Sequence, residues 1–232
     1  MTSDDDCAYA ELAQRDSVLA GVLAVYGPVA PFAWHDGGRT GTSQFAAMLL
    51  HVAGQRISAV AAFTVYDRIV AATGGGVPTA RAVAALGPGR LRACGLSPAR
   101  AAAALALAHA ELSGPLDIEH LDGVPDAEVV ARLTAVPGIG PWSAQTFLIH
   151  NLARPDVLPE SDQGLRQAIQ HLWSLGRPPT PAQVRDRGRA WSPHRSYAAA
   201  LLWRSLRPPG EPSDPKERAL RSRPGPPRRP SP

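Results

Sequence analysis

Apolar residues recur at the spacing of amphipathic helices along most of the chain. Alanine-rich runs with apolar residues at i, i+3 and i+4 dominate, whereas alternating runs of β-branched residues are scarce. Several runs begin with Ser, Thr or Asp, which are the residues that cap helix N-termini. The pattern predicts an all-α protein with helices at residues 43–54, 57–72, 78–86, 97–113, 125–135, 141–152, 162–175, 180–190 and 193–206.

The C-terminal segment has a different composition. From Arg207 onward, proline, glycine and charged residues replace the large apolar ones. A segment of this kind buries too little apolar surface to offset the entropy lost on ordering. We therefore expect one domain over residues 1–206 and a disordered tail over 207–232.

Charge is unevenly distributed within the predicted domain. Residues 132–206 hold nine arginines and four acidic residues, whereas residues 1–131 hold eight arginines and 13 acidic residues. A positive face on the C-terminal half would suit a polyanion such as DNA. Solvated surface charge explains the same counts equally well.

Composition excludes several classes of protein. The two cysteines, Cys7 and Cys94, are too few for a disulfide framework, an iron–sulfur cluster with four thiolates or a four-cysteine zinc site. The histidines show no HExxH spacing, which argues against a zinc hydrolase. The acidic N-terminus is not a secretory signal, and no apolar run is long enough for a membrane span. We expect a cytoplasmic, nucleoid-associated monomer.

The most informative segment covers residues 127–153. A predicted helix ends near Ala135, the sequence VPGIG follows, and a second helix starts with Pro141 at its first turn. Gly138 and Gly140 permit positive φ angles and a close approach of the backbone to a ligand. Free N–H groups at the start of the second helix form an anion site that suits a DNA phosphate. A plain tight turn between two helices is the simpler alternative, but the pattern LxxVPGIGPWSA is more specific than a pair of glycines.

The same hairpin offers ligands for a cation. The carbonyl oxygens of Thr134, Val136 and Ile139 are expected to point away from the phosphate site, where they would hold a monovalent Na⁺ or K⁺ ion that bridges to the phosphate. We expect no required cofactor and no iron–sulfur cluster.

This segment resembles the helix-hairpin-helix DNA glycosylase superfamily, and in particular its 3-methyladenine DNA glycosylase II branch. The resemblance continues in order over roughly residues 43–206, through HVAGQRISAVAA (51–62), LRACGLSPARA (91–101), RPDVLPESDQGLRQAI (154–169) and WSPHRSYAAALLWR (191–204). It implies a two-lobed helical glycosylase fold with a cleft between the lobes. The barrel lobe would cover about residues 43–152, and the second lobe residues 1–42 plus 153–206.

The resemblance makes Asp162 the catalytic residue. It lies 20 residues after Trp142, where an aspartate opens the helix that follows the hairpin. Cleavage of an N-glycosidic bond puts oxocarbenium character on the deoxyribose, which a carboxylate stabilises, and the same group can orient or deprotonate water. The ordinary alternative for Asp162 is a helix N-cap, and both roles can coexist. We interpret Glu160 and Asp156 as surface or loop residues.

The position of lysine limits the predicted chemistry. Bifunctional relatives carry a lysine two residues after the second hairpin glycine, where it forms a Schiff base; here that position is Trp142. The chain's single lysine, Lys216, falls in the predicted tail, and arginine cannot replace an amine nucleophile. The sequence therefore predicts a monofunctional glycosylase that leaves an intact abasic site.

The resemblance also suggests a base pocket. Trp142 and Trp203 match aromatic positions of that pocket, where they would stack on an electron-poor base, although either one could simply pack in the core. One helical turn after Trp142 this chain has Thr146 in place of another aromatic residue. That departure leaves the preferred base open.

Arg56 is a second departure from the family pattern. Its position in GQRIS matches a residue that enters the gap left by a flipped base, which is usually Gln or Leu, and a surface phosphate contact is the alternative. Gln55 is expected to shape the same loop. Arg166 either pairs with Asp162, four residues earlier, or covers surface.

These observations favour hydrolytic release of alkylated purines, of the 3-methyladenine type, from double-stranded DNA. Two alternatives remain at this point. One is a glycosylase for deaminated or oxidised bases, and the other is a non-catalytic protein that recognises damaged DNA.

Overall fold

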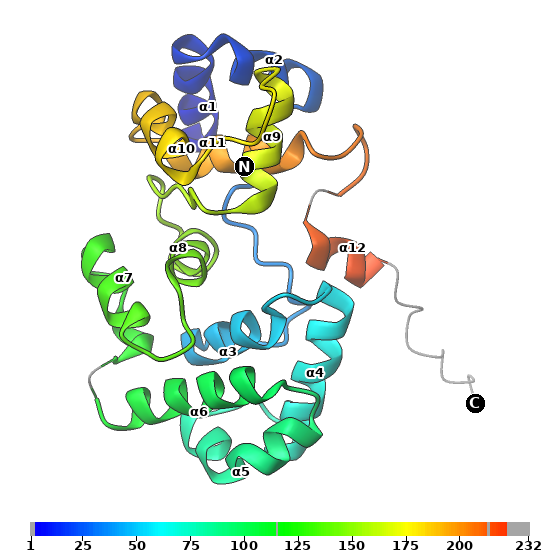
Figure 1. The fold of residues 1–232 in the computed structure, drawn as a ribbon, viewed down its shortest axis with the longest axis vertical. Helices are drawn as coiled ribbons and strands as arrows, with labels where there is room; N and C mark the ends of the chain where they lie inside the picture. The colour runs from blue at the N-terminus through cyan, green and yellow to red at the C-terminus, as the bar shows by residue number, and fades with distance from the viewer. Residues whose placement is uncertain (1–2, 115, 213, 222–232) are drawn as a thin grey trace.

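The computed structural model describes residues 3–114, 116–212 and 214–221. Every regular element within them is helical, as the sequence predicts (Figure 1). The helices are α1 (Ser3–Arg15), α2 (Ser17–Tyr26), α3 (Gln44–Gly54), α4 (Ala59–Ala72), α5 (Ala80–Ala93), α6 (Pro98–Leu112), α7 (Asp126–Thr134), α8 (Pro141–His150), α9 (Gln163–Leu172), α10 (Pro181–Gly188), α11 (Arg195–Arg204) and α12 (Pro215–Arg221), with short 3-10 turns at Ile118–His120 and Arg189–Trp191.

Side-chain caps fix many of the helix starts. In each case a hydroxyl or carboxylate oxygen accepts a hydrogen bond from a backbone N–H of the first turn, which satisfies a donor that the helix itself leaves free. The capping residues are Asp16, Ser43, Ser58, Thr79, Ser97, Asp162 and Thr180.

The described residues form two hydrophobic cores. The first is built by α3 to α8 and contains Phe63, Tyr66 and Phe147. The second is built by α1, α2 and α9 to α11 and contains Trp191. Figure 1 shows the two groups of helices at opposite ends of the molecule, with α8 between them. The chain passes between the two ends at residues 27–43 and 151–162.

The N-terminal helices α1 and α2 were absent from the sequence prediction. Their buried residues, among them Leu12 and Leu19, pack against α11, which lies far along the chain. Tyr197 on α11 also donates a hydrogen bond to Asp5 Oδ1 at 3.1 Å. Tertiary contacts of this kind stabilise helices whose local pattern is weak.

Two predicted boundaries also differ from the structure. Helix α5 continues to Ala93, beyond the expected end at residue 86, through a kink at Gly87, where φ is +65°. The second difference concerns the C-terminal segment. The prediction of disorder from residue 207 is wrong for residues 215–221, which form α12. Ala219 is buried in the first core and Leu220 packs against it, which helps to anchor the helix.

Within the described part of the chain, no helix is both long and apolar enough to cross a lipid bilayer.

Candidate functional site

The hairpin between α7 and α8 is anchored to α6. Gly138 has a φ of +90°, and a Cβ atom at this position would lie 2.5 Å from the Cβ of Ala103. Both facts require glycine, because other residues rarely adopt this φ and because α6 leaves no room for a side chain. Gly138 therefore holds the turn tightly against the barrel lobe.

The backbone conformation of Gly140 differs from the one expected from the sequence. Its φ is −96°, so the predicted use of positive φ is wrong at this glycine. A Cβ atom there would meet nothing within 4 Å, and the backbone is thus open to an approaching ligand. Among the described residues, no hydrogen bond uses the N–H groups of Gly138, Gly140, Trp142 or Ser143. These free donors surround the N-terminus of α8, where the helix dipole favours an anion.

Ile139 contributes less to this surface than the sequence suggests. Its side chain is buried in the barrel core, and its N–H donates to the Val136 carbonyl at 3.1 Å. The carbonyl oxygens of Ile139 and Thr134 accept no hydrogen bond within the described residues. They keep the lone pairs that a monovalent cation would need.

The loop between α3 and α4 lies beside the hairpin. Gln55 Nε2 donates to the carbonyl oxygen of Gly138 at 3.0 Å, and Arg100 Nη1 donates to the carbonyl of Ala53 at 2.7 Å. Arg56 follows these two anchors in the chain; it is exposed and has a φ of +56°, a conformation that costs a non-glycine residue about 1–3 kcal/mol. The two contacts hold the loop where α3 ends, and Ser58, which accepts a hydrogen bond from the Ala61 N–H, caps α4 on the other side of Arg56.

Asp162 is half-buried at the start of α9, where three donors converge on its carboxylate. Trp142 Nε1 donates to Oδ2 at 2.8 Å, and Trp203 Nε1 donates to Oδ1 at 2.9 Å. The backbone N–H of Leu165 donates to Oδ1 at 2.7 Å. Asp162 is therefore the N-cap of α9. In addition, the indole N–H groups of Trp142 on α8 and Trp203 on α11 hold its carboxylate in one orientation.

Gly164 makes space for this arrangement. A Cβ atom at residue 164 would lie 3.2 Å from Asp162 Oδ1 and 3.3 Å from Leu206 Cδ1. A larger residue here would therefore press on the carboxylate.

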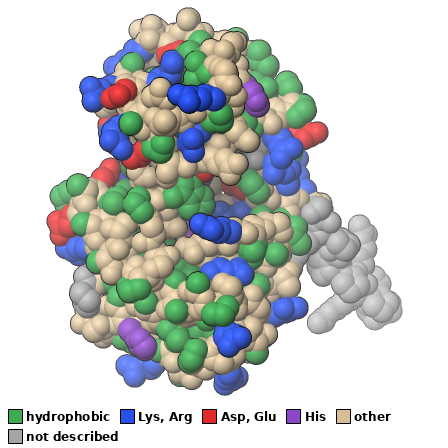
Figure 2. Space-filling model, in the orientation of Figure 1, with side chains coloured by type: hydrophobic (Ala, Val, Ile, Leu, Met, Phe, Trp, Pro, Cys, Tyr) green, Lys and Arg blue, Asp and Glu red, His purple; other side chains and the backbone are tan. Residues whose placement is uncertain are grey.

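A cavity of about 930 Å³ opens next to Asp162. It lies at the hollow between the two lobes, with Lys and Arg side chains around it on the face shown in Figure 2. The three predicted pocket residues all line it, namely Trp142, Trp203 and Thr146. The Thr146 hydroxyl donates to the Trp142 carbonyl at 2.9 Å, so this residue turns its hydroxyl back into α8. The volume is that of a typical small-molecule site.

Two histidines that the sequence analysis did not select, His51 and His150, also line the cavity, and Trp34 packs against both of them. The rings of Trp34 and His51 stack with centroids 4.7 Å apart, and the ring of His150 lies 6.3 Å from Trp34 and 5.9 Å from Trp203. Burial, reinforced by the positive charge of Lys216, lowers the pKa of His150 to about 4 and holds that of His51 well below its usual range. These histidines are therefore neutral at physiological pH.

The C-terminal segment completes the cavity. Residues of α12 and the segment before it, including Asp214 and Lys216, line the cavity, and Lys216 Nζ lies 4.1 Å from the centre of the Trp34 ring. Glu217 Oε2 lies 3.9 Å from His35 Nε2. No local signal marked Lys216 and Glu217, since Trp34 and His35, which they contact, lie more than 150 positions earlier in the chain.

Arg166, Asp156 and Glu160 make hydrogen bonds to neighbouring segments of the fold and none to Asp162. Arg166 Nε donates to the Pro179 carbonyl at 2.6 Å, so of the two predicted alternatives the structure favours a contact away from Asp162. Asp156 pairs with Arg195 through two hydrogen bonds of 2.7 and 2.9 Å, which lower the pKa of the Asp156 carboxyl. Glu160 accepts a hydrogen bond from Gln145 at 2.8 Å.

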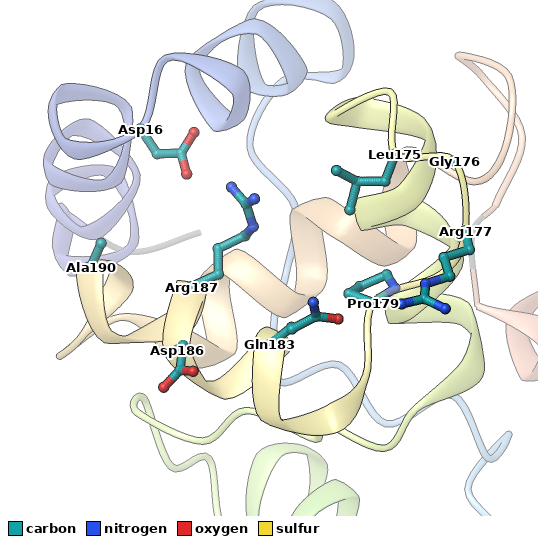
Figure 3. Close-up of a pocket in the computed structure, with 9 residues that line it drawn as sticks. All are labelled: Asp16, Leu175, Gly176, Arg177, Pro179, Gln183, Asp186, Arg187 and Ala190. Carbon is teal, nitrogen blue, oxygen red and sulfur yellow. The ribbon is translucent and has the colours of Figure 1, made fainter.

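A second cavity of about 880 Å³ lies in the lobe that contains α1 and α10. Its lining includes Asp16, Arg177 and Arg187, and Figure 3 shows the Arg187 side chain extending toward Asp16. The Arg187 guanidinium also lies 4.4 Å from the centre of the Trp173 ring. None of the predicted site residues lines this cavity.

The chain is similar in sequence to known DNA repair proteins. Residues 50–194 match the family model described as HhH-GPD superfamily base excision DNA repair protein. The chain is 30% identical over 156 residues to DNA-3-methyladenine glycosylase 1 of Schizosaccharomyces pombe, an alignment that covers 66% of this chain and 68% of that protein. It is 34% identical over 126 residues to DNA-3-methyladenine glycosylase 2 of Escherichia coli, which covers 54% of this chain and 42% of that protein.

Solved structures show the same fold. The 3-methyladenine DNA glycosylase of S. pombe in complex with abasic DNA superposes with a TM-score of 0.73 at 26% identity, covering 85% of this chain and 95% of that one. The DNA-3-methyladenine glycosidase of Bacillus halodurans gives a TM-score of 0.70 at 25% identity, covering 85% and 88%. Both likenesses extend over both lobes.

Proposed function

Because the chain belongs to the HhH-GPD superfamily of base excision DNA repair proteins, we propose that it releases alkylated purines from double-stranded DNA and that Asp162 is its catalytic residue. The observation that carries the proposal is the pair of indole donors on the Asp162 carboxylate at the edge of the cavity. The relatives named for 3-methyladenine supply the substrate class, and the neighbour bound to abasic DNA supports DNA as the partner.

The mechanism begins with flipping of the damaged nucleotide. The enzyme reaches the glycosidic bond when the base leaves the stack and enters the cavity beside Asp162. Free N–H groups at the start of α8 hold a nearby phosphate, and Arg56 fills the gap in the duplex. Gln55 couples the loop of Arg56 to the phosphate-binding hairpin, so both contacts form on one surface.

Asp162 then supports bond cleavage. As the base departs with the bonding electron pair, positive charge grows on C1′ of the deoxyribose, and the carboxylate stabilises it. The same carboxylate accepts a proton from the attacking water, whose oxygen bonds to C1′. Trp142 and Trp203 fix the carboxylate in place, so little reorganisation is needed during the step.

We propose that the reaction ends with an intact abasic site. Trp142 occupies the position where bifunctional relatives carry the lysine nucleophile, and the one lysine of this chain lies against Trp34 at another part of the cavity wall. Borohydride treatment of the full-length protein with damaged DNA is expected to trap no covalent adduct. An adduct that disappears in Lys216→Met would overturn this part of the proposal.

The hairpin carbonyls fit a monovalent cation. The oxygens of Thr134 and Ile139 are free of described hydrogen bonds, and that of Val136 accepts one. A Na⁺ or K⁺ ion held by the three would add positive charge next to the phosphate bound at α8.

The activity is tested by chromatographic analysis of the bases freed from methylated duplex DNA. We expect 3-methyladenine among the products and no cleavage of the strand. Failure to release any base from methylated, deaminated or oxidised DNA would overturn the proposal and favour a protein that binds damage without cutting.

A further inference from the structure

The cavity of about 880 Å³ beside α10 is separate from the cavity that contains Asp162, because the two share no lining residue. It is bounded by α10, by the connector at residues 173–180 and by Asp16 at the start of α2 (Figure 3). Its volume is that of a site for a small organic ligand. The base release proposed at Asp162 makes no use of it.

Both acidic residues of this cavity already have partners. Asp16 accepts hydrogen bonds from two backbone N–H groups of α2, at 3.0 and 3.3 Å, and one of 2.9 Å from Trp191 Nε1. Its charge also lies at the N-terminus of α2, where the helix dipole stabilises an anion. Asp186 Oδ1 lies 3.0 Å from Arg189 Nη2. The negative charges of the lining are therefore balanced by groups other than Arg177 and Arg187.

Arg187 is fixed in the cavity without a polar partner. The carbon of its guanidinium group lies 4.4 Å from the centre of the Trp173 ring, which in turn lies 6.1 Å from the fully buried ring of Trp191. Stacking on an aromatic ring leaves the N–H donors at the edge of the guanidinium plane free. Within the described part of the chain, the Arg187 side chain makes neither a hydrogen bond nor an ion pair.

Arg177 and Gln183 add further donors. Arg177 is exposed on the connector, and among the described residues its side chain also lacks a hydrogen bond or an ion pair. Gln183 Oε1 accepts the Thr180 N–H at 2.8 Å in the capping box of α10, which uses the acceptor of the amide and leaves its Nε2 group free. Figure 3 shows the three side chains coming from two elements, Gln183 and Arg187 from α10 and Arg177 from the connector. The cavity therefore offers unused donors, while its carboxylates and amide oxygen are engaged.

Unused donors of this kind suit an oxyanion. Guanidinium groups form charge-assisted and often bidentate hydrogen bonds with phosphate oxygens. A phosphate monoester carries a charge of about −1.5 to −2 at pH 7, which two arginines match, whereas a carboxylate or a phosphate diester carries a single charge. Leu175, Pro179 and Ala190 give the same cavity an apolar part that can contact an organic group on the phosphate.

We propose that this cavity is a binding site for a phosphate monoester, carried either by a free nucleotide or by the end of a nucleic-acid strand. Arg177 and Arg187 bind the phosphate oxygens, and Gln183 Nε2 supplies a third donor. The site does not depend on the base release proposed at Asp162, since the two cavities have no residue in common.

The experiment compares ligands that differ only in the phosphate. Calorimetry measures binding of adenosine 5′-monophosphate and of adenosine to the full-length protein, and fluorescence anisotropy measures binding of a short DNA strand with and without a 5′-phosphate. We expect the phosphate to strengthen binding at least about tenfold in one pair or both. Preference in the nucleotide pair identifies a free nucleotide as a source, and preference in the DNA pair alone identifies the strand end.

Two variants place the bound phosphate in this cavity. Arg187→Met keeps an apolar contact with Trp173 and removes the charge, and Arg177→Met changes an exposed residue of the connector, where the core is not disturbed. Each is expected to weaken binding of the phosphorylated ligand at least about tenfold and to leave the unphosphorylated one unchanged.

Arg185→Met is the matched control. Arg185 is an exposed arginine of the same helix, it pairs with Glu160 at 3.3 Å, and it does not line the cavity. This variant should bind both members of each pair as the wild type does. Three results would overturn the proposal: no preference for phosphate in either pair, a preference that persists in both Arg177→Met and Arg187→Met, or the same loss in Arg185→Met.

Discussion

Trp142 and Asp162 are joined by a hydrogen bond of 2.8 Å from the indole Nε1 to Oδ2, although they begin two different helices. Trp142 lies in the first turn of α8, directly after the hairpin, and Asp162 caps α9. The contact therefore connects the hairpin, which we propose binds a DNA phosphate, with the carboxylate that we propose acts on the sugar.

Replacing Trp142 by Phe tests this connection. The change keeps an aromatic ring in the pocket and removes the donor to Oδ2. The carboxylate then keeps only one of the two indole hydrogen bonds that orient it. We expect single-turnover base release to fall about 10- to 100-fold while DNA affinity is kept. Trp203→Phe is the comparison, because Oδ1 retains the Leu165 amide and the loss should be smaller. Wild-type rates in both variants would contradict the role of the indoles.

The two hairpin glycines should respond differently to alanine. In Gly138→Ala the new methyl group meets Ala103 at 2.5 Å and the residue must hold a φ of +90°, so we expect a loss of about 1–3 kcal/mol in the free energy of unfolding and weaker DNA binding. In Gly140→Ala the methyl group meets nothing within 4 Å, and the stability should be nearly unchanged. Urea unfolding measures the stability of both variants. Equal losses of stability would contradict the different requirements for glycine at positions 138 and 140.

The positive φ of Arg56 is expected to lower the free energy of unfolding of the wild-type protein. Glycine adopts its φ of +56° without strain, so Arg56→Gly should unfold at a slightly higher urea concentration than the wild type. The same variant loses the side chain that we propose fills the duplex gap and should bind abasic duplex DNA more weakly. A fluorescence titration measures the affinity. Unchanged affinity would show that Arg56 does not enter the DNA.

Acid should destabilise the protein through its buried histidines. The pKa of His150 is about 4 in the folded protein, against about 6.5 in an unfolded chain. Between these values the unfolded state binds more protons, so the free energy of unfolding falls as the pH drops from about 7 to about 4. In His150→Phe the loss over this range should be smaller. Urea midpoints measured at both ends of the range test this, and an equal loss in the variant would contradict it.

Local patterns predicted much of the fold and part of the site. The spacing of apolar residues identified nine helices, and the glycines of the hairpin indicated its turn. Trp142 and Asp162 were selected through the resemblance to the helix-hairpin-helix DNA glycosylases, which the hairpin sequence and the ordered motifs around it indicate. Such features depend on residues close in the chain, which a single sequence records.

Contacts between distant segments account for what was missed. Lys216 joins the site through Trp34, which lies 182 positions earlier, and His51 faces Asn151. Neither pairing has a periodic or local signature. The same reason explains α12, since the charge and proline around it indicate disorder, whereas Ala219 and Leu220 pack on the first core, Lys216 lies over Trp34 and Glu217 lies beside His35.

The most direct test of the catalytic assignment is Asp162→Asn, because asparagine caps a helix as well as aspartate and keeps the fold. Bases released from methylated duplex DNA are measured by chromatography in a single turnover, and binding to the same duplex is measured beside it. We predict that release slows by at least about a hundredfold while the DNA is still bound. Release at the wild-type rate would contradict the account.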